Sequence, residues 1–273
     1  MGMEAFFISG AQHFIPGAWH FLKCLAPLRL EIGDWRLMTE LLCLTDAYLQ
    51  EFEATVTDQV DGGVVLDQTA FYPGGGGQPC DVGTLSAAGQ TWEVTAVKKV
   101  SGKPVHIIAG DLPAVGTKVT GNVDWDRRYQ LMRTHTAMHI LCGVVWRDYG
   151  ASVTGGNMDL LQGRMDFEFE TMRQELVAEI EAAINKEVAA ARPVMVNVLP
   201  REEAFQIPDL IRTKINLLPE GIKEVRTVEL VGLDLQADGG THVANTHEVG
   251  RLRVSNYKSK GKINKRIYVE LEQ

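Results

Sequence analysis

The chain has 273 residues, of which 45% are hydrophobic, and its 35 acidic residues outnumber its 27 lysines and arginines, which leaves a net charge of −8. This length is enough to bury a substantial core and suggests two domains. The acidic balance excludes a protein that binds nucleic acid through its overall charge, and no apolar run reaches the roughly 18 residues that a membrane helix requires.

The cysteines exclude a further class of site. Cys24, Cys43, Cys80 and Cys142 lie far apart and form no Cys-x-x-Cys pair. This usage is typical of a reducing compartment, so we expect a cytoplasmic protein without disulfides. Zinc sites built from cysteine alone are also excluded, and any metal must be held by histidine and carboxylate side chains.

Residues 1–37 contain aromatic clusters that follow neither the period of a strand nor that of a helix. No basic segment precedes residues 6–8 and no cleavage site of small residues is clear, so a signal peptide is not expected. We expect this segment to be a poorly ordered extension, with the working protein beginning near Met38.

Short strands separated by turns dominate residues 39–124. Residues 52–60 alternate between apolar and polar side chains, and a turn with two glycines leads into residues 64–67 (Val-Val-Leu-Asp), as in a hairpin. Further strands are predicted at residues 83–85, 91–97, 105–108 and 118–123. Strands at this spacing favour a small β-barrel, which we place over residues 38–125.

A run of four glycines, residues 74–77, interrupts this barrel and is followed by Gln78. Glycines let a backbone approach a partner closely, so Gly75, Gly76, Gly77 and Gln78 are candidate contacts for a substrate or a polymer backbone. A flexible loop would have the same composition. The Gly-Lys-Ser/Thr ending of a Walker loop is missing, so no nucleotide cofactor is expected.

The hydrophobic period changes near residues 124–126. Apolar residues then recur at steps of three and four as far as Tyr149, which predicts a helix capped by Asp124 or Asp126. The elements predicted after it are a strand at 164–169, a helix at 172–191, a strand at 194–198, a short helix at 201–205, and strands at 225–231, 249–255 and 263–271. This order predicts an α+β domain with an antiparallel sheet over residues 126–273.

Two histidines lie within the apolar stripe of the long helix. His135 and His139 are four residues apart, so one helical turn places both imidazoles on the same face, at a spacing that suits one metal ion. Two core histidines without a metal are the alternative. The two interpretations are about equally favoured, because each buried imidazole needs a partner.

Asp238 and His242 form a second candidate pair. The two glycines between them argue against a helix and allow a tight turn that directs both side chains the same way. Three histidines and one aspartate suit tetrahedral zinc or another divalent ion. Alternatively, Asp238 caps a turn and His242 is an ordinary strand residue. His247 is expected to face solvent. Thr136 stands where a zincin has its glutamate, which excludes that class of metalloprotease.

A basic stretch lies near the end of the chain. Residues 249–269 contain seven basic residues and no acidic one. In an acidic protein, a solvated face and a surface that contacts phosphates are about equally favoured.

Several motifs occur together in the order found in one family. His135-Thr-Ala-Met-His139, Asp238-Gly-Gly-Thr-His242 and then Asn245-Thr-x-Glu-Val-Gly resemble the alanyl-tRNA editing family (AlaX). That family is similar to the editing domain of alanyl-tRNA synthetase and to the second additional domain of threonyl-tRNA synthetase. The glycine-rich segment 71–79 and residues 156–167 fit as well, so the resemblance covers residues 39–273. The activating core of a synthetase is absent, so the chain looks like a free-standing editor.

The resemblance implies a hydrolase that removes serine, and also glycine, from mischarged tRNA(Ala). It implies one zinc ion per chain, with His135, His139, the residue at position 238, and His242 as ligands. The family usually has cysteine at position 238; Asp238 binds zinc at a similar distance but is a harder donor. Selecting serine over alanine requires a polar partner for the serine hydroxyl. The candidate catalytic residues for this role are Thr134, Thr136 and Thr241. Candidate tRNA contacts are Arg127, Arg128, Arg133, Arg251, Lys258, Lys260 and Lys262.

Two other functions remain open. If the change at Asp238 has removed catalysis, the chain is an RNA-binding module that binds tRNA without deacylating it. A zinc hydrolase of a small ester would instead show no salt-dependent binding of tRNA. The ordered set of motifs favours the editing enzyme over both.

Overall fold

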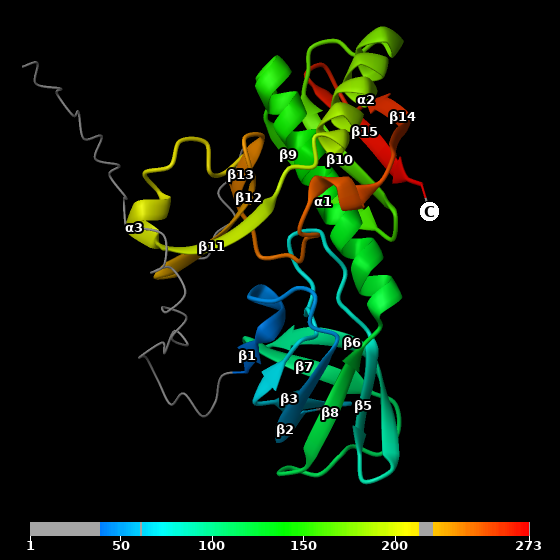
Figure 1. The fold of residues 1–273 in the computed structure, drawn as a ribbon, viewed down its shortest axis with the longest axis vertical. Coiled ribbons are helices and arrows are strands. Elements are labelled where there is room, and N and C mark those ends of the chain that lie inside the picture. Colours follow the sequence, from blue (N-terminus) through cyan, green and yellow to red (C-terminus); the bar gives the residue numbers. More distant parts are fainter. Residues whose placement is uncertain (1–38, 61, 213–220, 273) are drawn as a thin grey trace, which may run out of the picture. The chain divides into compact units, whose positions relative to one another are not determined.

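The computed structural model describes residues 39–60, 62–212 and 221–272, so the predicted extension at residues 1–37 lies outside the described part. All described residues belong to one compact unit. In this part of the chain a closed antiparallel barrel is followed by two further antiparallel sheets and three α-helices (Figure 1). The predicted α+β class with an N-terminal barrel is therefore confirmed.

Six strands close into the barrel in the order β2-β3-β7-β6-β5-β8. Their bounds are β2 Glu51–Val60, β3 Gly63–Leu66, β5 Gly83–Ala87, β6 Gln90–Val100, β7 Lys103–Ile108 and β8 Lys118–Val123. The predicted hairpins β2–β3 and β5–β6 are confirmed. Alternate side chains such as Leu66 and Leu85 fill the interior with Phe71. The short strands β1 Glu40–Leu41 and β4 Gln68–Thr69 pair in parallel, and the 3-10 helix η2 Leu42–Leu44 follows β1.

The barrel interior contains one histidine. His106 is fully buried; its Nε2 lies 2.8 Å from Thr69 Oγ1 and its Nδ1 lies 3.2 Å from the carbonyl oxygen of Val64. Burial lowers the pKa of His106 from 6.5 to about 4, and the hydrogen bond to Val64 opposes this only in part. The ring is therefore neutral in the folded protein.

We expect this histidine to make the fold acid-sensitive. Between pH 6.5 and about 4 the unfolded chain protonates His106 while the folded chain does not, so stability falls as the pH drops through this window, by roughly 3 kcal/mol in total. Urea unfolding at pH 7 and pH 4.5 measures the effect. His106→Gln should lose less stability on acidification than the wild type, and an identical pH dependence of both proteins would contradict the prediction.

The second half of the chain begins with α1 Trp125–Tyr149, β9 Val153–Asp159, β10 Gln162–Glu168 and α2 Gln174–Ala189. The elements that follow are β11 Val194–Pro200, α3 Arg201–Ala204, β12 Glu224–Leu230, β13 Asp234–Ala237, the 3-10 helix η3 Thr246–Val249, β14 Leu252–Ser259 and β15 Asn264–Leu271. They form a four-stranded sheet, β14-β15-β10-β9, and a three-stranded sheet, β11-β12-β13, both antiparallel. The strands β9 and β13 were not predicted.

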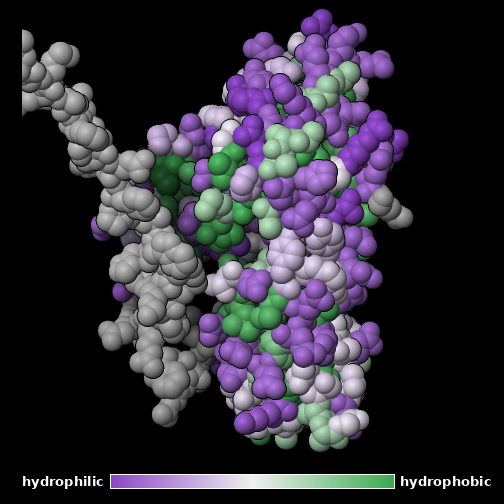
Figure 2. Space-filling view, viewed as in Figure 1, coloured by the Kyte–Doolittle hydropathy of each residue, from purple (hydrophilic) through white to green (hydrophobic). Residues whose placement is uncertain are grey.

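Helix α1 lies at the centre of this half and is buried along most of its length. It packs against α2 and the four-stranded sheet through a shared core that includes Ile140, Val144, Ile180, Ile184 and Ile267. Figure 2 shows hydrophilic side chains over most of the visible face of the described residues, interrupted by small hydrophobic patches. None of the helices in residues 39–272 that the structure describes is long and apolar enough to cross a membrane.

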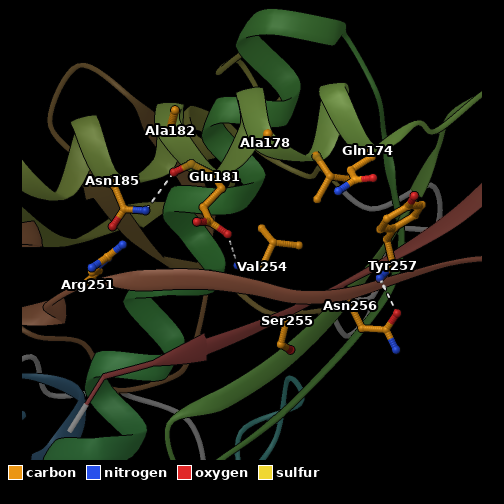
Figure 3. A pocket seen from close by; sticks show the side chains of 11 residues that line it. Gln174, Ala178, Glu181, Ala182, Asn185, Arg251, Val254, Ser255, Asn256 and Tyr257 are labelled. Atoms are coloured by element: carbon orange, nitrogen blue, oxygen red, sulfur yellow. Dashed lines mark hydrogen bonds between the residues drawn. The ribbon is translucent and has the colours of Figure 1, made fainter.

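Helix α2 covers part of the open edge of β14 (Figure 3). Asn185 Oδ1 accepts from the Leu252 N–H at 3.0 Å, and its Nδ2 donates to the Leu252 carbonyl at 2.7 Å. Glu181 Oε2 accepts from the Val254 N–H at 2.7 Å. These contacts satisfy backbone groups that would otherwise pair with another chain. Between helix and strand lies a groove of about 770 Å³.

Candidate metal centre

Helix α1 carries the first two ligand candidates in its buried middle. The helix begins at the predicted cap, since the Asp124 side chain accepts a hydrogen bond from the first turn at 3.1 Å. It ends at Gly150, whose left-handed backbone has a φ of 63°. The spacing of four residues places the rings of His135 and His139 together, with their centroids 5.3 Å apart.

The other two candidates lie on the segment after β13. Asp238 Oδ2 accepts from the Gly240 N–H at 2.6 Å, which tightens the turn. A Cβ at Gly240 would collide with the His135 ring, so only glycine lets this turn approach the helix. The His242 ring stacks on His135 with their centroids 4.2 Å apart, and it lies edge-on to His139 at 4.8 Å.

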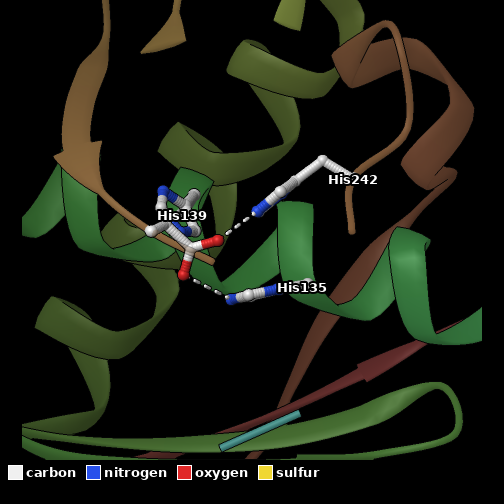
Figure 4. Close-up of side chains that lie close together, drawn as sticks. His135, His139 and His242 are labelled. Atoms are coloured by element: carbon white, nitrogen blue, oxygen red, sulfur yellow. Dashed lines mark hydrogen bonds and ion pairs between the residues drawn. The ribbon is translucent and has the colours of Figure 1, made fainter. Parts of the chain in front are cut away.

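The four side chains meet as the sequence predicts. One ligand atom from each of His135, His139, Asp238 and His242 lies within 4.8 Å of all the others (Figure 4). Asp238 Oδ1 lies 3.5 Å from His135 Nε2, and Asp238 Oδ2 lies 3.1 Å from His242 Nε2. Donors around a tetrahedral ion with bonds of about 2.0–2.1 Å are roughly 3.3 Å apart. The donor set therefore fits a single divalent metal ion.

Gln78, which follows the glycine run, fixes the orientation of His135. Its Oε1 accepts from His135 Nδ1 at 3.0 Å and from the Thr241 N–H at 3.0 Å. Its Nε2 donates to Thr241 Oγ1 at 2.8 Å, which determines which way the amide points. The barrel thus contributes a buried side chain to the cluster, although Gln78 and Thr241 are 163 residues apart in the sequence.

The other two imidazoles are held in the same way. His139 Nδ1 lies 3.0 Å from Asp234 Oδ2, and His242 Nδ1 lies 3.2 Å from Thr136 Oγ1. A histidine that donates through Nδ1 keeps its Nε2 lone pair for a metal, and such outer partners orient metal ligands in known sites. Each ring therefore presents Nε2 to the centre of the cluster.

Burial controls the charge of these groups. It lowers the pKa of His135 to about 4 and that of His242 well below its usual value, so both rings are neutral near pH 7. Burial also opposes protonation of His139, but the hydrogen bond and the charge of Asp234 outweigh it and raise the pKa. For Asp238, burial disfavours the carboxylate, while attraction to the histidines outweighs burial and lowers its pKa. An ionised carboxylate and neutral imidazoles are the forms that bind metals.

Two neighbours of the cluster were missed by the sequence analysis. Asp234 lies four residues before Asp238, but nothing in the sequence indicates that it contacts His139. Arg226 of β12 donates to the Asp238 carbonyl at 2.9 Å, and its Nη1 lies 3.8 Å from Asp238 Oδ2. This guanidinium adds positive charge beside the carboxylate, where a family member with cysteine would place a thiolate.

The three threonines predicted to be catalytic differ in their hydrogen-bond partners. Thr136 and Thr241 belong to the hydrogen-bonded groups that hold His242 and His135. The Thr134 hydroxyl instead donates to the Gln130 carbonyl at 2.8 Å, within the helix.

The prediction that Arg128 contacts tRNA is wrong. Its side chain is fully buried and forms an ion pair with Asp81. The same guanidinium donates to the carbonyls of Ala47 at 2.9 Å and Ala70 at 2.5 Å. A side chain without exposed surface is unavailable to a phosphate, and Arg128 instead joins α1 to the barrel.

The other predicted tRNA contacts stay predictions. Arg127 donates to the Cys80 carbonyl at 3.3 Å, and Arg133 donates to a carbonyl of the chain's last described residue, Glu272, at 2.7 Å. The glycine run Gly75, Gly76 and Gly77 approaches β9, where the Met158 N–H donates to the Gly77 carbonyl at 3.4 Å. The exposed members of the set are Gly75, Gly76, Gly77, Arg251, Lys258, Lys260 and Lys262, and His247 is exposed as predicted.

Two family models match this chain. One describes class II (A) tRNA synthetases and matches residues 34–127; the other describes the second additional domain of threonyl- and alanyl-tRNA synthetases and matches residues 225–268.

Curated relatives match over most of the chain. The alanyl-tRNA editing protein AlaX-M of Methanosarcina barkeri is 41% identical, over 86% of this chain and 99% of that protein. The AlaX-M protein of Saccharolobus solfataricus is 42% identical, over 85% of this chain and 98% of that protein. The alanine–tRNA ligase of Pyrobaculum aerophilum is 39% identical over 79% of this chain, but this match spans only 25% of the ligase. Since the match to two AlaX-M proteins extends over nearly their whole length, this chain belongs to the AlaX family of alanyl-tRNA editing proteins.

Proposed function

We propose that this protein is an aminoacyl-tRNA deacylase that acts in trans on mischarged tRNA(Ala). Its main substrate is tRNA(Ala) charged with serine, and tRNA(Ala) charged with glycine is a second one. The observation that carries the proposal is the cluster in which one ligand atom from each of three histidines and one aspartate lies within 4.8 Å of all the others. The names of the AlaX-M relatives support alanyl-tRNA as the class of substrate.

One zinc ion is the metal that we assign to His135, His139, Asp238 and His242. Histidine and aspartate both bind zinc at about 2.0–2.2 Å, and the neutral rings of His135 and His242 and the ionised Asp238 are in the forms that bind a metal. A bound zinc ion supplies positive charge that can polarise the ester carbonyl, lower the pKa of water or hold the amino group of the substrate.

The protein's own residues position this site. Gln78 and Thr136 hold two of the rings in place, which keeps the ligand geometry preorganised. Thr241 Oγ1 accepts from Gln78 Nε2, and because its side chain is fully buried it holds Gln78 in place without reaching the substrate. A site that hydrogen-bonds the hydroxyl of serine would reject alanine, which lacks it. Glycine lacks this hydroxyl as well, so its acceptance over alanine would rest on its smaller size.

Deacylation assays on three charged forms of tRNA(Ala) test the proposal. We expect hydrolysis of the seryl form and, more slowly, of the glycyl form, while the alanyl form is spared. A chelator should stop the reaction and zinc should restore it. If the protein carries one bound metal per chain yet hydrolyses neither mischarged form, it is not a deacylase, and salt-dependent tRNA binding would then identify an RNA-binding module instead.

A further inference from the structure

The outward face of the four-stranded sheet carries three cations around one phenol. Along β15, the inward residues such as Ile267 and Val269 are buried, so the alternate residues Arg266 and Tyr268 point outward. The register places Arg164 of β10 opposite Tyr268, and Lys258 of β14 opposite Arg266. We call Arg164, Lys258, Arg266 and Tyr268 the basic face cluster.

The cations of this cluster converge on Tyr268. Lys258 Nζ lies 5.5 Å and Arg266 Cζ lies 5.9 Å from the centroid of the Tyr268 ring. A hydrogen bond from Arg266, together with attraction to Lys258 and Arg164, lowers the pKa of the phenol. Three cations beside one phenol form the kind of surface that recognises an anion.

Only one of the three cations in the cluster forms an ion pair with a carboxylate of the described residues. Arg266 makes a two-point ion pair with Asp166, at 2.6 and 2.7 Å. No carboxylate among the described residues forms an ion pair with Arg164 or Lys258. Like charges on directly opposed residues, such as Lys258 and Arg266, destabilise a sheet. An arrangement that weakens the isolated fold in this way points to an external partner of opposite charge.

The cluster is connected to the metal centre through neighbouring strands. Asn157 of β9 lies opposite Arg164, and the next residue of β9 donates its N–H to the Gly77 carbonyl. Gln78, the residue after Gly77, contacts His135. Since β9 is two strand spacings from β15, the cluster lies about 10 Å across the sheet from the strand that contacts the glycine run.

We propose that the basic face cluster binds a backbone phosphate in the acceptor stem of the tRNA substrate and so directs the charged 3′ end past the glycine run towards the metal centre. This inference rests on the proposed function, because it assigns the substrate's stem to this sheet. The phosphate contact is independent of sequence and contributes to affinity and register.

A pair of double variants with the same change in net charge tests the assignment. Arg164→Gln with Lys258→Gln removes the two cations that lack a carboxylate. Lys98→Gln with Lys118→Gln, on exposed barrel positions, is the control. Binding of uncharged tRNA(Ala) is measured over a range of salt concentrations, together with the KM and kcat of deacylation, the melting temperature and the metal content.

We expect the cluster variant to bind tRNA at least about tenfold more weakly than the control. Its plot of log affinity against log salt should be less steep by roughly 0.7–0.9, the contribution of one phosphate contact. KM should rise while kcat and metal content stay unchanged, because the contact is made equally in the ground and transition states. Equal binding by both variants, or equal weakening in both, overturns the assignment.

The two proposals fail in different ways in this experiment. A wild-type protein that deacylates seryl-tRNA(Ala), with a KM that the cluster variant does not change, overturns the phosphate site alone. A wild-type protein that deacylates neither mischarged form, yet loses tRNA affinity in the cluster variant, overturns the deacylase alone.

Discussion

Replacing His139 by alanine is expected to abolish stoichiometric metal binding and to lower kcat/KM for seryl-tRNA(Ala) at least about 100-fold, because loss of an outer partner alone costs roughly 10–100-fold in metal affinity. His139 is the ligand candidate whose Nδ1 is held by a buried carboxylate, Asp234, so its loss removes a donor and also leaves Asp234 without that partner. Metal content by atomic absorption and deacylation rates under saturating zinc measure the two effects.

His247→Ala is the matched control for this substitution. His247 lies five residues after His242, is exposed, and is not part of the cluster. It should retain wild-type metal content and activity. A His139→Ala protein that keeps one metal per chain would show that His139 is not a ligand. If His139→Ala instead lost its metal but kept full activity, the metal would be excluded from the reaction.

Replacing Arg128 by methionine is expected to destabilise the protein by about 3–5 kcal/mol, the usual cost of leaving one partner of a buried ion pair uncompensated. Asp81, whose side chain is 1% exposed, would lose its guanidinium partner, although it still accepts from the Tyr72 N–H at 2.6 Å. The carbonyls of Ala47 and Ala70 would also lose a donor. Urea unfolding at pH 7 measures the change in stability.

Arg127→Met, the adjacent position, is the control for this prediction. Arg127 is partly exposed and its hydrogen bonds to the Cys80 carbonyl are 3.3 and 3.4 Å long, so the loss should stay within about 1 kcal/mol. The double variant Arg128→Met with Asp81→Asn removes both charges and should recover part of the lost stability. A cost for Arg128→Met no larger than that of the control would contradict the assigned role of the ion pair.

Local sequence patterns predicted the secondary-structure elements that depend on residues close together in the chain. The apolar stripe and Asp124 predicted α1, and alternation with a glycine turn predicted the β2–β3 hairpin. The same patterns missed β9, because Gly155 and Gly156 interrupt its alternation, and β13, because four residues are too few to show a period. The spacing of His135 and His139 was informative because both ligands lie on one helix.

The sequence by itself determined the α+β class, the barrel, the helix that carries His135 and His139, and the four ligand candidates, since each is recorded in short-range periodicity or in an ordered set of motifs. Only the tertiary structure decided that Gln78 holds His135, that Asp234 holds His139, and that Arg128 is buried against Asp81 rather than exposed to RNA. These are contacts between side chains 47 to 95 residues apart, and their partners are chosen by packing, which no local pattern encodes.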